Sequence, residues 1–286
     1  MGFEPVTWRT KSRVLTTDDH TLVMGIVNVT PDSFSDGGRW DTVDTAIARG
    51  LELVATGADI VDIGGESTRP GAVPVDSIEE RARVIPVVEA LASEGVVVSI
   101  DTSKPEVAAA AIDSGAEIVN DVTGLSSESM LEVCGAGGVG VVIMHMQGDP
   151  RSMQIDPTYV DVVVDVAAFL GDRAAGAVDA GIGRDRIVVD PGIGFGKTFE
   201  HNLALLRSLE RLGGGFPLLV GASRKRFLGE ILDRAGRPSS PEDRDTATAA
   251  TVALAVAHGA SIVRVHDVTS AIDAARTADA IVRGLS

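Results

Sequence analysis

Two aspartates, Asp101 and Asp190, each end a short apolar run of the chain and are expected to point toward a desolvated interior. A buried carboxylate without a partner is costly, so each of them needs a donor nearby. Asn120 lies near the end of another run of the same kind, Lys225 follows a further one, and both are candidate partners. Together the four side chains offer both donors and acceptors. We interpret them as one candidate site that could hold a flat heterocycle with donor and acceptor edges.

Arg264 and His266 are separated by one residue near the end of the last apolar run, so on a strand they project from the same side. The guanidinium fork of arginine suits phosphate oxygens, and a histidine adds a second donor. The alternative for Arg264 is a surface salt bridge to one of the many carboxylates. Two such side chains at one strand end favour an anion site instead. His145 is a lone histidine on another run and is interpreted as a core residue.

A metal cage made only of protein side chains is not expected. The sequence has no H-E-x-x-H motif and no cluster of cysteines and histidines with zinc spacing. A magnesium ion that also binds a diphosphate needs little from the protein, and Asn28, at the end of the first apolar run, could supply one oxygen. The sequence also has no P-loop and no G-x-S-x-G, which argues against a nucleotide kinase and an α/β-hydrolase.

Short apolar runs rich in Val and Ile alternate with stretches of helical periodicity along the whole chain. Such runs are typical of strands buried on both faces of a parallel sheet. Strict alternation of this kind predicts a single (β/α)8 TIM barrel in the α/β class, with its chemistry at the C-terminal ends of the strands. The eight predicted strands are Leu22–Val29, Asp59–Gly64, Val96–Asp101, Glu117–Val122, Val139–Met144, Arg186–Asp190, Pro217–Gly221 and Ser261–Val265.

A six-residue unit of the form Gly-Ala-x-Ile-Val-x occurs at residues 57–62, 115–120 and 259–264. In each copy a glycine ends a helix and a short apolar strand follows. Asp62, Asn120 and Arg264 occupy the same step, so quasi-equivalent barrel units would bring them to the same mouth. The alternative fold, a doubly wound open sheet, should show G-x-G-x-x-G after its first strand, and this sequence has none there.

Length and charge set further limits. The 286 residues fit one barrel domain over 1–286, in which residues 1–21 are expected to form a short N-terminal hairpin that covers one end. The net charge of −16 argues against nucleic acid and against an anionic membrane as partners. A single cysteine, Cys134, fits a reducing compartment. Without an apolar run of ~20 residues or a signal-peptide core, the protein is expected in the cytoplasm.

Five motifs, in consistent order from about Val23 to the C-terminus, resemble the signatures of the dihydropteroate synthase family. They are Asn28-Val-Thr-Pro-Asp-Ser-Phe-Ser-Asp-Gly-Gly, Gly64-Gly-Glu-Ser-Thr-Arg-Pro-Gly, Asp190-Pro-Gly-Ile-Gly-Phe-Gly-Lys, Ser223-Arg-Lys and Arg264-Val-His. The resemblance implies a transferase of folate biosynthesis, which sulfonamides target as mimics of p-aminobenzoate. It would condense 6-hydroxymethyl-7,8-dihydropterin diphosphate with p-aminobenzoate to 7,8-dihydropteroate and diphosphate by an SN1-like mechanism. It also implies Mg2+ as cofactor and a homodimer.

The resemblance also assigns residues to three subsites. It implies that Asp101, Asn120, Asp190 and Lys225 hold the pterin and carry the catalysis. Asn28, Arg264 and His266 would bind diphosphate and magnesium. The p-aminobenzoate would be framed by Phe34, Thr68, Arg69, Pro70, Phe195 and Ser223, with the loops after the first two strands closing over it.

Two alternatives share a pterin-binding barrel but differ in chemistry. A methyltetrahydrofolate-corrinoid methyltransferase has no use for a diphosphate subsite at Arg264 and His266. A non-catalytic homologue should lack one of Lys225, Arg69 or Asp101, and all three are present. A sulfonamide-insensitive member of the same family is compatible with this sequence.

Overall fold

The computed structural model describes residues 5–30, 39–67, 74–149 and 152–284. Four residues that the family resemblance assigns to the p-aminobenzoate site therefore lie outside the described residues: Phe34, Thr68, Arg69 and Pro70.

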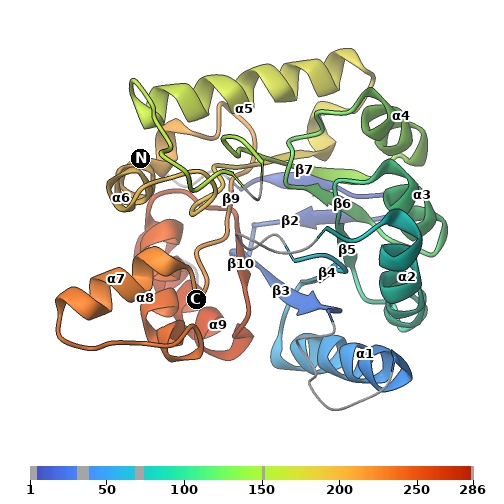
Figure 1. Cartoon of the computed structure of the whole chain (residues 1–286), viewed down its shortest axis with the longest axis horizontal. Coiled ribbons are helices and arrows are strands. Elements are labelled where there is room, and N and C mark those ends of the chain that lie inside the picture. Colours follow the sequence, from blue (N-terminus) through green and yellow to red (C-terminus); the bar gives the residue numbers. More distant parts are fainter. Residues whose placement is uncertain (1–4, 31–38, 68–73, 150–151, 285–286) are drawn as a thin grey trace.

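Eight parallel strands form the centre of the molecule (Figure 1). In sheet order they are β8 (Ile187–Asp190), β7 (Gly140–Met144), β6 (Ile118–Asp121), β5 (Val98–Asp101), β4 (Ile60–Gly64), β3 (Leu22–Asn28), β10 (Ile262–Val265) and β9 (Leu219–Val220). The two ends of this sheet meet, because Val189 of β8 forms a parallel bridge with Leu218 and its N–H donates to the carbonyl of Pro217 at 3.0 Å. The predicted (β/α)8 barrel is confirmed, and of the predicted strand over Pro217–Gly221 two residues are regular strand.

Helices surround the strands on all sides in Figure 1. Side chains cap several of them in the way that their sequences favour: Asp76 accepts from the N–H of Glu79 at the start of α2, and Asp161 caps α5. The helices are α1 (Arg39–Thr56), α2 (Ser77–Ser93), α3 (Pro105–Asp113), α4 (Glu128–Gly137), α5 (Val162–Asp179), α6 (Phe199–Arg207), α7 (Arg226–Arg234), α8 (Asp245–Ala257) and α9 (Val268–Arg283). No helix in the described ranges is long and apolar enough to cross a membrane.

The N-terminal hairpin closes one end of the barrel. Strands β1 (Thr7–Arg9) and β2 (Val14–Thr16) pair antiparallel, as the sequence predicted for this segment. Trp8 is 1% exposed, and its indole N–H donates to the carbonyl of Arg186 at 2.9 Å, directly before β8. The indole packs against a cluster of apolar side chains inside the barrel. The hairpin therefore seals the N-terminal end of the strands with a large buried aromatic residue.

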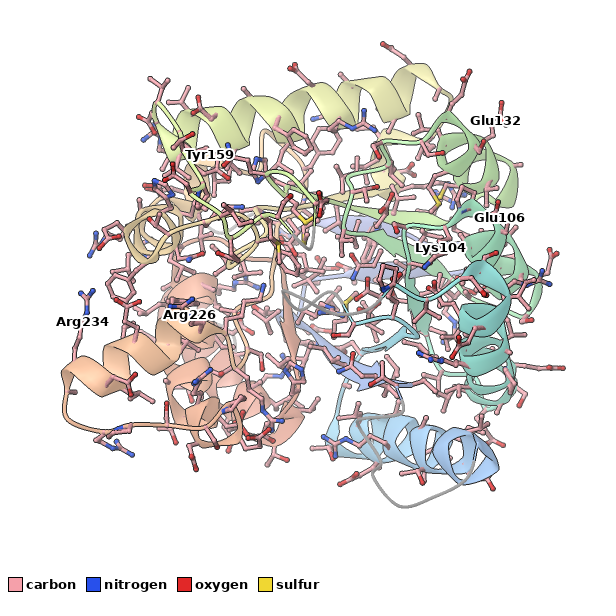
Figure 2. The ribbon with its side chains drawn as sticks, viewed as in Figure 1. Lys104, Glu106, Glu132, Tyr159, Arg226 and Arg234 are labelled. Atoms are coloured by element: carbon pink, nitrogen blue, oxygen red, sulfur yellow. The ribbon has the colours of Figure 1, made fainter. Side chains whose placement is uncertain are left out.

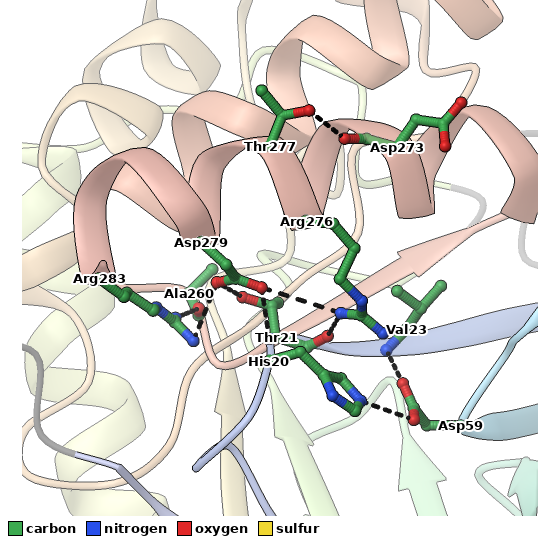
Figure 3. Close-up of polar contacts among 10 residues, drawn as sticks. All are labelled: His20, Thr21, Val23, Asp59, Ala260, Asp273, Arg276, Thr277, Asp279 and Arg283. Atoms are coloured by element: carbon green, nitrogen blue, oxygen red, sulfur yellow. Dashed lines mark hydrogen bonds and ion pairs between the residues drawn. The ribbon is translucent and has the colours of Figure 1, made fainter. Parts of the chain in front are cut away.

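The last helix is tied to the first barrel strand by a buried ionic network (Figure 3). Asp279 of α9 accepts hydrogen bonds from the N–H and the hydroxyl of Thr21, both at 2.8 Å, and pairs with Arg283 at 3.1 Å. Arg276 of the same helix donates to the carbonyl of Thr21 at 2.9 Å. These contacts join the two ends of the (β/α)8 repeat, so the ring closes through side chains as well as through the sheet.

Alternation along the strands divides the barrel interior into two parts. Inward-facing apolar residues near the hairpin, among them Ile60 and Ile118, form the cluster that packs on Trp8. Two residues further along the same strands, Asp62 and Asn120 point to the same side. A second and larger apolar core fills the space between the sheet and the helices. The fold thus sets polar side chains on an apolar base at the C-terminal mouth.

Candidate active site

A cavity lies at the C-terminal mouth of the barrel. All four residues of the first candidate site line it together with Arg264 and Phe195. The complete lining is Asp101, Asn120, Val122, Met144, Asp190, Phe195, Gly221, Lys225 and Arg264. These residues come from strand ends, or from loops directly after them, that are far apart in the sequence. The structure therefore brings the predicted quartet into one place, as the barrel topology requires.

Arg264 is bound to two carboxylates inside the barrel. Its Nε donates to Asp62 Oδ2 at 2.6 Å, and its Nη2 donates to Asp101 Oδ2 at 2.7 Å. Asn120 Nδ2 donates to the same oxygen of Asp62 at 3.1 Å. The hydrogen-bonded partner of Asp101 is thus Arg264 and neither of the two candidates from the sequence, since the long side chain on β10 spans the interior. The salt bridge of Arg264 is buried and does not lie on the surface.

Asp62 is a site residue that sequence reasoning did not assign. It is 0% exposed, and one of its oxygens receives both Arg264 and Asn120. These three residues are the equivalent last positions of the repeated Gly-Ala-x-Ile-Val-x unit. The repeat was therefore the signal that could have found Asp62.

Burial displaces the pKa values of the ionisable groups around the cavity. It raises the pKa of Asp101 to about 7; Arg264 opposes this shift, whereas the charges of Asp62, Glu80 and Asp121 add to it. Burial also raises the pKa of Asp190, against the charge of Lys225 and the N–H of Gly192, which donates to Asp190 at 2.7 Å. The pKa of Lys225 is lowered to about 8 by burial. The cavity is therefore lined by ionisable groups that are shielded from water.

The loop after β8 passes directly over Lys225. The ammonium group of Lys225 donates to the carbonyl of Ile193 and lies 4.4 Å from the centre of the Phe195 ring. Gly194 has a φ of +84°, and a Cβ added there would lie 2.9 Å from Cδ of Lys225. A glycine is therefore required for this loop to set Phe195 beside Lys225.

Lys197 and His145 join the same loop to the end of β7. Nζ of Lys197 lies 2.9 Å from Nδ1 of His145 and donates to the carbonyl of Phe195 at 2.9 Å. Tyr159, labelled in Figure 2, donates its hydroxyl to the carbonyl of Gly196 at 2.7 Å. His145 is buried and packs edge-on against another aromatic ring, as a core residue would. Lys197 is the last residue of the motif that begins at Asp190, but the sequence alone predicts no role for it.

Ser223 and His266 are in direct contact. Oγ of Ser223 lies 3.0 Å from Nδ1 of His266 and accepts the backbone N–H of His266 at 3.1 Å. Between Ser223 and Lys225, Arg224 has a φ of +60° and forms a two-point ion pair with Asp245 of α8, at 2.8 Å for both bonds. This pair anchors the turn after β9. The residues assigned to the p-aminobenzoate and diphosphate subsites thus adjoin each other.

A second ionic cluster anchors the chain on both sides of residues 68–73. Lys104, labelled in Figure 2, forms ion pairs with Glu66 and with the buried Glu80 of α2. Glu66 also accepts the N–H of Val75 at 3.0 Å, and Arg83 of α2 donates to the carbonyl of Gly65 at 2.8 Å. The chain before and after residues 68–73 is therefore fixed to α2 and to the start of α3.

Asn28 ends β3 beside Gly64 of β4, with which it is paired in register. A Cβ added to Gly64 would lie 3.8 Å from Oδ1 of Asn28 and 3.8 Å from Oδ2 of Asp101. Glycine at this position keeps the space between these two oxygens open. Within the described ranges no group of three or more His, Cys, Asp or Glu side chains is placed to hold a metal ion.

Comparison with known proteins gives a consistent result. Residues 24–266 match the family of pterin-binding enzymes. The chain is 49% identical to dihydropteroate synthase of Mycobacterium leprae, covering 90% of this chain and 92% of the relative, and 44% identical to that of Escherichia coli K12, covering 91% and 92%. It superposes on the Xanthomonas albilineans dihydropteroate synthase with 4-aminobenzoic acid with a TM-score of 0.89, at 46% identity over 96% of this chain and 98% of that one. For the Burkholderia cenocepacia enzyme complexed with 7,8-dihydropteroate, the TM-score is 0.87 at 43% identity over 97% and 96%.

Proposed function

The chain belongs to the dihydropteroate synthase family of pterin-binding enzymes, and from this membership we propose that the cavity at the C-terminal mouth of the barrel is its active site. The enzyme is a transferase that joins 6-hydroxymethyl-7,8-dihydropterin diphosphate to p-aminobenzoate, giving 7,8-dihydropteroate and diphosphate. The observation that carries the site assignment is the shared cavity of Asp101, Asn120, Asp190 and Lys225.

The quartet is proposed to bind the pterin ring. The carboxylates of Asp101 and Asp190 accept hydrogen bonds from ring N–H and amino groups, and Lys225 donates to ring acceptors. Phe195, held 4.4 Å from the ammonium of Lys225, supplies an aromatic wall. Because the groups are desolvated, each contact counts for more than it would in water.

Arg264 and His266 are proposed to bind the diphosphate. Arg264 uses Nε and one Nη2 hydrogen on Asp62 and Asp101, and its guanidinium carries five donors in all. Its remaining N–H groups are available for phosphate oxygens, where arginine forms charge-assisted bonds.

Mg2+ is proposed to be held by Asn28 together with the diphosphate. The fit rests on chemistry: an amide oxygen beside the open space at Gly64 suits an oxygen-preferring ion that takes most of its ligands from phosphate and water. When bound, such an ion neutralises charge on the leaving diphosphate.

The reaction is proposed to proceed in an SN1-like manner. The bond between the pterin methylene carbon and the diphosphate oxygen breaks heterolytically, and the electron pair leaves with the diphosphate. The positive charge left on carbon spreads into the pterin ring, where the carboxylates of Asp101 and Asp190 stabilise it. The amine of p-aminobenzoate then forms the new C–N bond and releases its proton to solvent. Proximity replaces a general base, because the carbon is already a strong electrophile.

The p-aminobenzoate is proposed to bind between Phe195 and Ser223 on one side and Phe34, Thr68, Arg69 and Pro70 on the other. The ion pairs of Glu66 and Lys104 support the second side, since they fix the chain that flanks residues 68–70.

An assay of diphosphate release tests the proposed function. With p-aminobenzoate present, diphosphate and 7,8-dihydropteroate should form in equal amounts, and a sulfonamide should inhibit in competition with p-aminobenzoate. A corrinoid methyltransferase would release no diphosphate, and a non-catalytic homologue would bind the pterin without turnover. Either result would contradict the proposal.

We further propose a cytoplasmic homodimer. Leu254 of α8 is 62% exposed and Ile231 of α7 is 39% exposed, and we propose that both side chains lie in the interface with a second copy. The only cysteine, Cys134, is a buried free thiol, which fits a reducing compartment. Light scattering after size exclusion should give twice the chain mass, and Leu254→Glu should halve it.

A further inference from the structure

One carboxylate oxygen in the barrel interior accepts hydrogen bonds from two side chains of the site. Oδ2 of Asp62 accepts from Arg264 Nε at 2.6 Å and from Asn120 Nδ2 at 3.1 Å. Asp62 is 0% exposed, and its Oδ1 has no hydrogen-bond partner among the described residues. Asp62 does not line the cavity itself. Its hydrogen bonds can therefore affect a ligand only through Arg264 or Asn120.

The contact with Asn120 determines which way its amide group faces. A carboxylate accepts hydrogen bonds only, so the NH2 group of Asn120 must turn toward Asp62. The amide oxygen and the second amide hydrogen are then left for the cavity, which Asn120 lines. Without the carboxylate, the amide could turn over and present its two donors instead. Asp62 therefore determines whether Asn120 presents a hydrogen-bond acceptor or only donors to the cavity.

The contact with Arg264 has a different consequence. Arg264 has two anionic partners: Asp62 is fully buried and does not line the cavity, whereas Asp101 lines it. A ligand that donates hydrogen bonds to Asp101 competes with Arg264 for that carboxylate. A buried guanidinium that loses its only counter-charge is costly. With Asp62 in place, Arg264 keeps one fixed partner while Asp101 turns to the ligand.

We propose that Asp62 is a positioning residue: through one oxygen it fixes the Asn120 amide for the pterin and the Arg264 guanidinium for the diphosphate. This inference rests on the proposed function of the cavity. It assigns a role to the Asp of the Val61-Asp62-Ile63 strand segment, which touches neither substrate.

The test separates the two routes with two probes on the full chain. In Asp62→Asn the shape is kept but the charge is lost. Titration calorimetry should show that 6-hydroxymethylpterin, which lacks the diphosphate, binds about 10-fold more weakly because the Asn120 amide is no longer fixed. Magnesium diphosphate should also bind about 10-fold more weakly, because Asp101 is then the one remaining anionic partner of Arg264 and the guanidinium is no longer held in place by Asp62. The KM for p-aminobenzoate, at saturating pterin diphosphate, should stay within about twofold, which a general loss of structure would not allow.

Ser99→Ala is the matched control. Ser99 faces Asp62 across the β4–β5 register, is 0% exposed, and its hydroxyl has no partner among the described residues. Removing this polar atom from the same level of the barrel should leave the binding of both 6-hydroxymethylpterin and magnesium diphosphate unchanged. The inference is overturned if Asp62→Asn binds both probes within about twofold of the parent, or if Ser99→Ala weakens them equally.

A measurement on the unmodified protein keeps the inference testable if Asp62→Asn does not fold. The Nε–H signal of Arg264, identified by its absence in Arg264→Lys, should exchange slowly with solvent and remain slow when 6-hydroxymethylpterin is bound. Fast exchange in the bound state would show that Asp62 does not hold Arg264 and would overturn the inference. An active parent enzyme with negative results here refutes only the role of Asp62. A parent that releases no diphosphate refutes the proposed function itself.

Discussion

Nζ of Lys197 lies 2.9 Å from Nδ1 of His145, and both side chains are buried. The contact joins the loop after β8 to the end of β7, directly behind the aromatic wall at Phe195. Burial lowers the pKa of Lys197 to about 7 and that of His145 to about 3. At pH 7 the imidazole of His145 is therefore neutral, and Lys197 is at the midpoint of its titration and loses its charge as the pH rises.

This pair predicts a pH dependence of stability. An exposed lysine has a pKa of 10.5, so between pH 7 and 10.5 the unfolded chain binds a proton on Lys197 that the folded chain does not. Unfolding then takes up a proton, and the free energy of unfolding rises with pH. Lys225, with a pKa of about 8, adds to this rise, whereas Asp101, with a pKa of about 7, still loses part of its proton in this range and opposes it. The difference between the parent and a variant without Lys197 therefore reports on Lys197. Urea unfolding of the parent should show a rise of about 1 kcal/mol over this range.

Lys197→Met is the comparison for that measurement. Methionine keeps most of the length of the side chain but binds no proton, so the free energy of unfolding of the variant should stay nearly flat from pH 7 to 8. Equal slopes in the two proteins would mean that Lys197 is charged in the folded state and that the pair is an ordinary hydrogen bond.

Lys225→Ala should fold but lose most activity. It removes the cation that faces Asp190 and the Phe195 ring, and with it a preorganised contact to the pterin. The specificity constant for pterin diphosphate should fall by about two to three orders of magnitude. Arg234→Ala, at the far end of the helix that Lys225 precedes, removes an exposed cation and should leave the rate unchanged. Near-full turnover of Lys225→Ala would refute its place in the pterin site.

Activity should follow a bell-shaped pH profile. Asp101 must be ionised to accept hydrogen bonds from the pterin, and its pKa of about 7 places the acidic limb there. Lys225 must be protonated to donate, and its pKa of about 8 places the alkaline limb. The specificity constant for pterin diphosphate should therefore fall below pH 7 and above pH 8. In Asp101→Asn the acidic limb should disappear along with most of the rate. A flat parent profile from pH 6 to 9 would contradict both assignments.

The sequence predicted which strands carry the site residues, but it did not predict which side chains form contacts across the barrel. Apolar runs gave the order and position of the strands, so the convergence of Asp101, Asn120, Asp190 and Lys225 could be predicted. The repeated unit placed Asp62, Asn120 and Arg264 at one level of the barrel. It could not show that Arg264 pairs with Asp101, because that depends on which strands face each other across the interior and on the reach of one long side chain. The same limit applies to Lys197 and His145, whose contact depends on the path of a loop.

The contact between Ser223 and His266 predicts that the diphosphate and p-aminobenzoate subsites are coupled. Oγ of Ser223 lies 3.0 Å from Nδ1 of His266, so an anion that draws the imidazole toward itself also reorients the hydroxyl that we propose to face p-aminobenzoate. Titration calorimetry should show tighter binding of p-aminobenzoate when magnesium diphosphate is present, by about 5-fold or more.

By linkage, p-aminobenzoate should tighten the binding of magnesium diphosphate by the same factor, and this reciprocal titration is the internal control. His266→Ala should reduce the coupling toward unity while 6-hydroxymethylpterin binds as in the parent, because His266 is not among the described residues that line the cavity of the quartet. His266→Ala thus distinguishes a loss of coupling between the two subsites from a loss of the pterin site itself. If p-aminobenzoate binds the parent equally well with and without magnesium diphosphate, the two subsites act independently. The substrates could then bind in either order, and the hydrogen bond between Ser223 and His266 would serve only to hold the ends of β9 and β10 together.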